Sequence, residues 1–170
     1  STRTIGYDYA ATGAALDFLA AGDVLTVTYD VHVNDISGSY SATRQVTVTI
    51  KGTNDAPIAV NDTATGGQDT VLRGNVKSND SDIDTSFSIV EYSVDGTSWT
   101  AAGQDLVIDG KGTINIGTTG VWAFTPAAGY SGTVPDITYR IQDVVVANDT
   151  GDTALSATAK LHIEIGRAHV

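Results

Sequence analysis

The sequence predicts an all-β protein whose main part is an antiparallel β-sandwich. Apolar and polar residues alternate with a period of two along many short segments, as in strands that bury one face. These segments are rich in Val, Ile and Thr, and clusters of Gly, Asn and Asp separate them. The one stretch with helical character, "AALDFLAAGD" at residues 14–23, is a short turn that Gly22 would end.

The first 53 residues hold too few strands for a complete domain. Residues 24–33, "VLTVTYDVHV", and residues 44–50, "RQVTVTI", alternate strictly and flank the turn cluster "NDISGS". We therefore expect an antiparallel pair. This predicts that residues 1–53 are the C-terminal part of a truncated β domain and that residues 54–57 are a linker.

Residues 58–165 are numerous enough for one complete sandwich of about 100 residues. Short strands separated by turn residues are typical of two packed antiparallel sheets. The predicted strands are residues 58–65, 70–76, 87–94, 105–110, 112–117, 120–126, 135–143 and 153–165.

Composition argues against several classes of function. Nine basic and 20 acidic residues give a net charge of −11, which repels nucleic acid and anionic membrane surfaces. The sequence has no Cys, so it forms neither a disulfide nor a thiolate metal site, and no apolar run is long enough to insert into a membrane. No His lies in a polar loop beside a plausible nucleophile, so we predict no enzyme.

Both ends indicate a piece of a longer protein. The sequence contains no Met, even at position 1. Its last residues, "IGRAHV", equal one reading frame of a common DNA-library sequencing adapter, ATC GGA AGA GCA CAC GTC. We expect the natural sequence to stop near Glu164 and residues 166–170 to be a non-native tail; the alternative is a genuine exposed tail.

Acidic residues gather around the linker motif "GTNDAP". On the usual path of a sandwich, the segments "SNDSDIDTS" and "QDVVVANDTGDT" both return to the linker end. The residues that this path would bring together are Asp55, Asp62, Asn79, Asp80, Asp82, Asp84, Asp143, Asn148, Asp149 and Asp152.

Such a gathering suits calcium. Carboxylates repel one another unless a cation neutralises them, and Ca²⁺ binds carboxylate, amide and carbonyl oxygens on loops. We predict that Ca²⁺ is bound at an interdomain junction by ligands among Asp55, Asp62, Asn79, Asp80, Asp82, Asp84 and Asp143. The alternative is that these residues only form Asx turns.

Two stretches resemble known families of repeats. Residues 16–57, "LDFLAAGDVLTVTYDVHVND…TVTIKGTNDAP", look like the end of a VCBS repeat. The following "IAVNDTATGGQDTVLRGNVKSNDSDIDT…VWAFTPAAGYSG…ITYRIQD" resembles the Ig-like or cadherin-like repeat of large bacterial RTX-type adhesins. Together the matches cover nearly all of residues 16–164.

The resemblance implies a calcium-stiffened structural repeat in an adhesin stalk on the bacterial cell surface, exported by a type I system. Its partners would be neighbouring repeats of the same chain. The acidic positions of the family match Asp55, Asp82, Asp84 and Asp143. The sequence departs from the family where "DSDIDT" replaces "DADGD" and where "DVVVANDTGD" replaces "DGNGG".

Aromatic residues leave a second function open. Trp122 alternates with Phe124, and Tyr139 with two isoleucines, so both are predicted core residues. Trp99 lies near a turn in "VDGTSWTAAG" and could contact a ligand. The alternative function is therefore a module that recognises a surface glycan or protein.

Overall fold

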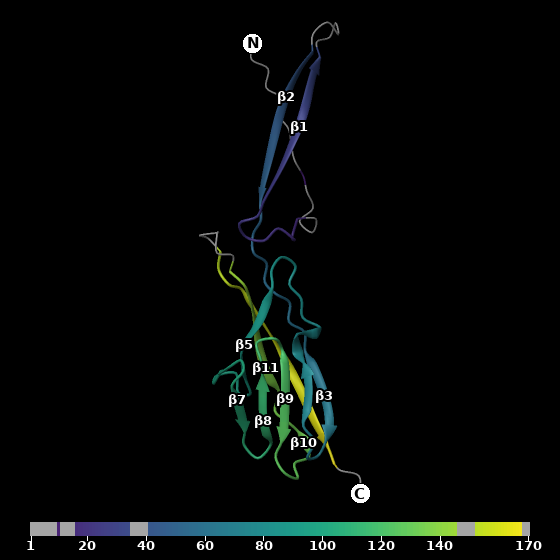
Figure 1. Ribbon diagram of the computed structural model, residues 1–170, viewed down its shortest axis with the longest axis vertical. Coiled ribbons are helices and arrows are strands. Elements are labelled where there is room, and N and C mark those ends of the chain that lie inside the picture. The colour runs from purple at the N-terminus through teal and green to yellow at the C-terminus, as the bar shows by residue number, and fades with distance from the viewer. Residues whose placement is uncertain (1–9, 11–15, 35–40, 146–151, 168–170) are drawn as a thin grey trace. The chain divides into compact units, whose positions relative to one another are not determined.

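The computed structural model describes residues 10, 16–34, 41–145 and 152–167. All regular structure in that part of the chain is β, apart from one 3₁₀ turn. The chain divides into two compact units, residues 1–54 with 146–152 and residues 55–145 with 153–170. Figure 1 labels β1 and β2 in the first unit, and the other labelled strands belong to the second.

The first unit contains an antiparallel sheet of β1 (Val24–Asn34) and β2 (Ser41–Lys51). Val27 pairs with Val48, and their apolar neighbours in register share one face, while Thr residues line the other. The predicted antiparallel pair is confirmed, and residues 35–39 of its predicted turn lie outside the described residues. Residues 16–23 form hydrogen-bonded turns rather than a helix.

Two sheets form the second unit. The larger sheet has the order β10 (Gly132–Thr133), β12 (Ser156–Gly166), β11 (Ile137–Asp143), β5 (Phe87–Ser93) and β6 (Thr100–Ala101), and β3 (Asp62–Gly67) also pairs with β12. The smaller sheet has the order β4 (Leu72–Asn75), β9 (Val121–Pro126), β8 (Gly112–Ile116) and β7 (Asp105–Ile108). The 3₁₀ turn η2 (Val76–Ser78) follows β4.

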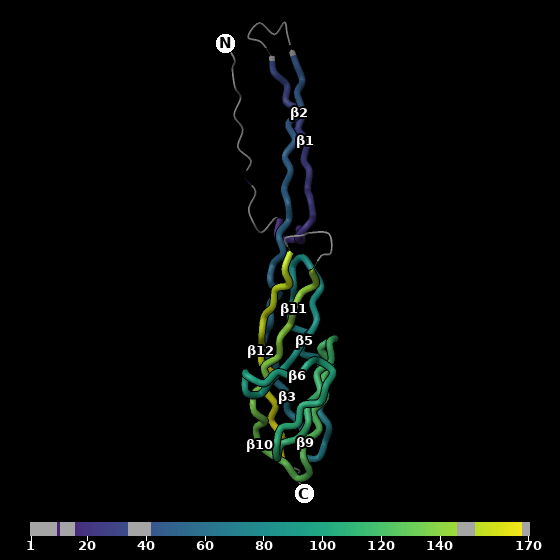
Figure 2. The backbone as a smooth tube through the Cα atoms, turned by 90° about the vertical axis from the view of Figure 1, so that its left-hand side faces the viewer, coloured from purple at the N-terminus to yellow at the C-terminus, as the bar shows by residue number. Residues whose placement is uncertain are grey.

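The pairing is antiparallel throughout these sheets except between β3 and β12, which run parallel. Figure 2 shows β11 and β12 side by side in the backbone trace. The predicted Ig-like sandwich is therefore confirmed, with its N-terminal strand added in parallel to its C-terminal strand.

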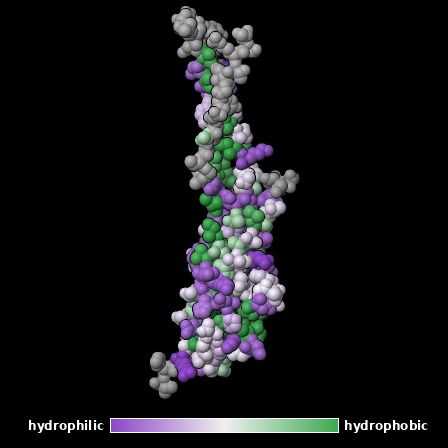
Figure 3. Space-filling view, turned by 180° about the vertical axis from the view of Figure 1, so that it is seen from behind, coloured by the Kyte–Doolittle hydropathy of each residue, from purple (hydrophilic) through white to green (hydrophobic). Residues whose placement is uncertain are grey.

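The core is formed by alternate side chains of both sheets. Ile137, Tyr139 and Ile141 of β11 are completely buried, and Phe124 and Trp122 of β9 meet them from the smaller sheet. Both aromatic predictions for the core, Trp122 and Tyr139, are confirmed. On the face drawn in Figure 3, apolar surface is broken into separate patches among hydrophilic residues, as expected when most large side chains lie inside.

All eight strands predicted for this unit are present. β3 begins only at Asp62, because Ile58 makes an isolated bridge with Ser81 instead of joining a ladder. β6 and β10 have two residues each, which is too short for a periodic signal in the sequence.

Gly74 tests the packing between β4 and β9. A Cβ at this position would lie 2.8 Å from three atoms of the Trp122 indole, which is 4% exposed and cannot swing into solvent. We expect Gly74→Ala to lower the free energy of unfolding by about 1–3 kcal/mol in urea denaturation. Gly67→Ala is the matched control, since its nearest atom is Thr70 Oγ1 at 3.8 Å. Equal stability of the two variants would contradict this account of the packing.

Candidate functional site

The first acidic cluster joins the segment before β3 to the loop after η2. The Asp55 N–H donates to Asp84 Oδ2 at 3.0 Å. Asp82 Oδ1 accepts from the backbone N–H groups of Asp84 and Thr85, at 3.1 and 2.8 Å. Asp82 thus closes an Asx turn, and residues 83–85 bend rather than run extended. The carboxylates of Asp82 and Asp84 are therefore not presented side by side along a strand.

Two carboxylate oxygens of this cluster are shielded from solvent without a hydrogen-bond donor. They are Asp82 Oδ2 and Asp84 Oδ1, and Thr85 Oγ1 shares their situation. Burial raises the pKa of Asp84, and the negative charges of Asp82 and Asp55 raise it further. Asp84 is therefore close enough to be repelled by both Asp82 and Asp55, and part of this oxygen-rich surface is unsatisfied.

The second cluster surrounds the Tyr139 hydroxyl. Tyr139 Oη lies 2.9 Å from the Val60 carbonyl oxygen, 3.0 Å from Asp62 Oδ2 and 3.3 Å from the Val76 carbonyl oxygen. Both carboxylate oxygens of Asp80 lie 3.3 Å away, and Asp80 Oδ1 also accepts the Val60 N–H at 2.8 Å. One hydroxyl thus connects β11 with the start of β3 and with the η2 loop.

This second cluster contains more acceptors than protons. The hydroxyl has one proton for two carbonyls and two carboxylates. Burial is the largest cause raising the pKa of Asp62 and of Asp80. Burial and the two neighbouring carboxylates raise the pKa of Tyr139 above its ordinary value, so the phenol stays protonated and remains the donor.

The other predicted ligands in the described residues, Asn79 and Asp143, make hydrogen bonds to the backbone. Asn79 donates its amide to the Val60 and Asn61 carbonyl oxygens, both at 3.3 Å. Asp143, at the end of β11, accepts the Leu155 N–H at 2.8 Å and is 6% exposed. Asn148 and Asp149 lie outside the described residues.

The seven predicted ligands therefore do not converge on a single point. Hydrogen bonds and charge link Asp55, Asp82 and Asp84 in one group and Asp62 and Asp80 in another. No group of three or more His, Asp or Glu side chains in the described ranges is arranged to hold a metal ion by itself. The assignment of these residues to calcium stays a prediction.

Trp99 belongs to a third polar group, on the outer face of the larger sheet. The Arg140 guanidinium lies 4.4 Å from the centre of its ring and pairs with Glu91 at 2.5 Å. Asp95 holds the turn that leads to Trp99, because its Oδ1 accepts the N–H groups of Thr97 and Ser98, both at 2.7 Å. Trp99 was identified in the sequence as a possible ligand contact. Arg140 and Glu91 were not, because their proximity depends on the register in which β11 pairs with β5.

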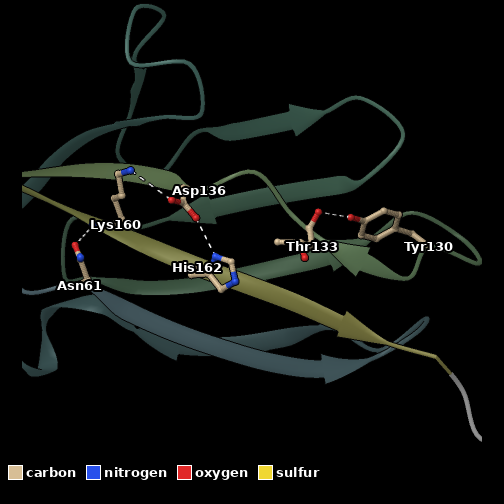
Figure 4. A network of polar contacts seen from close by, with 6 residues as sticks. All are labelled: Asn61, Tyr130, Thr133, Asp136, Lys160 and His162. Carbon is tan, nitrogen blue, oxygen red and sulfur yellow. Dashed lines mark hydrogen bonds and ion pairs between the residues drawn. The ribbon is translucent and has the colours of Figure 1, made fainter.

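A fourth group, drawn in Figure 4, lies on the exposed face of β12. Asp136 Oδ1 is 2.9 Å from His162 Nδ1, and its Oδ2 is 3.4 Å from Lys160 Nζ. The His162 side chain is 45% accessible. His32, on β1, is likewise exposed.

Comparison with known proteins identifies the fold family. The sequence model of the bacterial Ig domain matches residues 54–162, and the chain belongs to this family. No curated protein matches the chain. A nucleoside hydrolase-related hypothetical protein from Saccharophagus degradans, described as associated with carbohydrate metabolism, is similar over 66% of this chain with 17% identity and a TM-score of 0.43. The chain spans 26% of that protein, and a likeness this weak carries no functional argument.

A search of the described residues for membrane-spanning helices found none of sufficient length and apolarity.

Tyr139→Phe tests the second cluster. The substitution keeps the buried ring but removes the proton shared among four acceptor groups, so we expect the free energy of unfolding to fall by about 1–3 kcal/mol. Tyr130→Phe is the matched control, because the Tyr130 hydroxyl donates to the Thr133 carbonyl oxygen at an exposed site. Chemical denaturation of both variants measures the difference, and an equal effect would contradict a special role of the Tyr139 hydroxyl.

Asp136 provides a direct electrostatic test. Its hydrogen bond to His162, followed by the interactions with Lys160, lowers its pKa below 3.8. Because the folded-state pKa is depressed, the stabilisation is complete above the unfolded-state pKa and is lost as the pH falls through the folded-state pKa. A carboxyl NMR titration should place the Asp136 midpoint below 3.8, and His162→Gln should move it upward. An unchanged midpoint in His162→Gln would exclude His162 as the main cause.

Proposed function

We propose that the chain is a non-enzymatic, calcium-stabilised structural repeat of a bacterial cell-surface adhesin stalk. The observation that carries the proposal is the first acidic cluster, where Asp55, Asp82 and Asp84 crowd together. Two of their carboxylate oxygens are shielded from solvent and have no donor. A bound cation would satisfy those oxygens and remove the repulsion between the carboxyl groups.

The chemistry of the cluster fits a hard cation. Ca²⁺ takes six to eight oxygens, and these include backbone carbonyls and water as well as carboxylates. Asp55, Asp82 and Asp84 would hold the ion, with the Thr85 hydroxyl beside them. Because no three carboxylates in the described residues form a metal site by themselves, main-chain or water oxygens would have to complete the coordination.

Calcium at this cluster would act on the connection into the sandwich. Asp55 precedes Pro57 and β3, whereas Asp82 and Asp84 lie in the loop that follows η2. An ion shared by both segments would fix residues 55–57 to that loop. Extracellular sites of this kind bind at about 10⁻⁴ to 10⁻³ M, so they would fill outside the cell and stay empty in the cytosol.

Membership of the bacterial Ig domain family agrees with a structural repeat of a surface protein. The adhesin assignment rests in addition on the resemblance of residues 16–57 to a VCBS repeat and of the following residues to RTX-type adhesins. Neighbouring repeats of the same chain are the proposed partners. A recognition module built on Trp99 has less support, because Arg140 already covers one face of that ring.

Thermal unfolding tests the calcium proposal. A ligand that binds only the folded state stabilises it by about 2.7 kcal/mol at a hundredfold excess over its Kd. We expect Ca²⁺ to raise the melting temperature of the chain relative to a chelator, Mg²⁺ to fail to do so, and Asp82→Asn/Asp84→Asn to abolish the shift. Asp109→Asn, an exposed acid of the β7–β8 turn, is the matched control and should keep it. A shift that survives in the double variant would place the ion elsewhere, and no shift at all would refute calcium binding.

A further inference from the structure

We propose that the parallel pair of β3 and β12 makes the sandwich a force-bearing module that resists being pulled apart by its own ends. This inference goes beyond calcium binding and does not depend on it, because it rests on strand topology alone. It concerns the second unit by itself.

The path of tension follows from the pairing register. Asp62 lies opposite Leu161 at one end of the ladder, and Gly67 lies opposite Gly166 at the other. The chain enters β3 at the Asp62 end and leaves β12 at the Gly166 end (Figure 1). Tension on the two ends therefore draws the strands in opposite directions along their own axes.

Such loading shears the ladder instead of peeling it. Six residue pairs connect β3 with β12, and five of them, from Asp62 and Leu161 to Gly66 and Ile165, precede the expected non-native tail at residues 166–170. Because the hydrogen bonds of a parallel pair are evenly spaced along it, tension along the strands loads them together, whereas peeling would break them one after another. Residues 68–155 lie outside the path of tension until the pair breaks, so the strength of the unit is set by this contact.

Contacts at both ends brace the ladder. Before it begins, the Lys160 N–H donates to Asn61 Oδ1 at 2.9 Å, as Figure 4 shows, and the Tyr139 hydroxyl holds the Val60 carbonyl oxygen at 2.9 Å. After it ends, the Gln68 N–H donates to the Gly166 carbonyl oxygen at 3.0 Å. The leading segment is thus tied to β11 and β12 before load reaches the first pair.

Burial holds β12 in place while β3 is pulled. Leu161, Ile163 and Ile165 of β12 are buried in the core, and β11 and β10 pair with its other edge. By contrast, β3 has no fully buried side chain: besides the ladder, it is held by the half-buried Ala64, by Gly66 beside Leu72 and by the Asp62 carboxylate at the Tyr139 hydroxyl. The step that resists force is accordingly the sliding of β3 along a fixed β12.

The experiment is single-molecule stretching of the full chain in two directions. Because the sequence contains no Cys, handles attach only at introduced cysteines. The pair Ala56→Cys/Arg167→Cys loads the ladder in shear. With the pair Ala56→Cys/Ser156→Cys, force is applied at the start of β12, and the ladder is peeled from its Asp62 end. Ala56, Ser156 and Arg167 are all exposed.

We expect a severalfold higher rupture force in the shear direction, because forced unfolding follows the unfolding barrier and not equilibrium stability. Both double variants should melt at the same temperature, so stability would not explain the difference. Equal rupture forces, or a higher force in peeling, would overturn the proposal. The measurements are made in chelator, so either result leaves the calcium proposal to its own test.

Two proline variants locate the resistance in the ladder itself. Successive residues of an edge strand point their N–H groups alternately to the partner strand and to solvent. Of Ala64→Pro and Thr65→Pro, one therefore removes a hydrogen bond to β12 and the other does not. We expect one variant to lower the shear rupture force clearly more than the other; equal forces in the two variants would place the resistance outside this ladder.

Discussion

The rest of the sandwich depends on the burial of β12 from Ala159 to Ile165. Four of its side chains, at alternate positions from Ala159 to Ile165, lie in the core. Its edges pair with β11 and β10 on one side and with β3 on the other, and β5 and β6 follow through β11. Every strand of the larger sheet is therefore attached to β12 directly or through β11, and that sheet forms one wall of the core.

The acidic residues near the linker form turns and backbone contacts with only part of their hydrogen-bonding capacity. Asp82 closes an Asx turn with one oxygen, and the other oxygen is left shielded without a donor. Asp80 similarly accepts a backbone N–H while it lies beside the Tyr139 hydroxyl. Turn formation and cation binding were posed as alternatives in the sequence, yet a carboxylate has two oxygens and can serve both.

The strands were predictable because each shows a local alternation of apolar and polar residues in the sequence. Alternation revealed all eight longer strands of the sandwich, and the spacing of Trp122 and Tyr139 assigned them to the core. The partners of Tyr139 were not predictable, since Val60 and Asp80 lie 79 and 59 positions away and their approach depends on tertiary packing. The pairing of Arg140 with Glu91 likewise required the register of β11 and β5. Sequence reasoning gathered the acids around one junction, whereas in the described residues Asp55, Asp82 and Asp84 form one group and Asp62 and Asp80 another.

The pairing of the first strand of the sandwich with its last also has a kinetic consequence. Asn61 and Lys160, which meet just before the ladder begins, are 99 positions apart in the sequence. Contacts of such separation close late, because the loop between them must be ordered first. A chain that emerges from the ribosome cannot complete the larger sheet until β12, its last strand, has appeared. The topology therefore delays closure of the unit until nearly the whole domain has been synthesised.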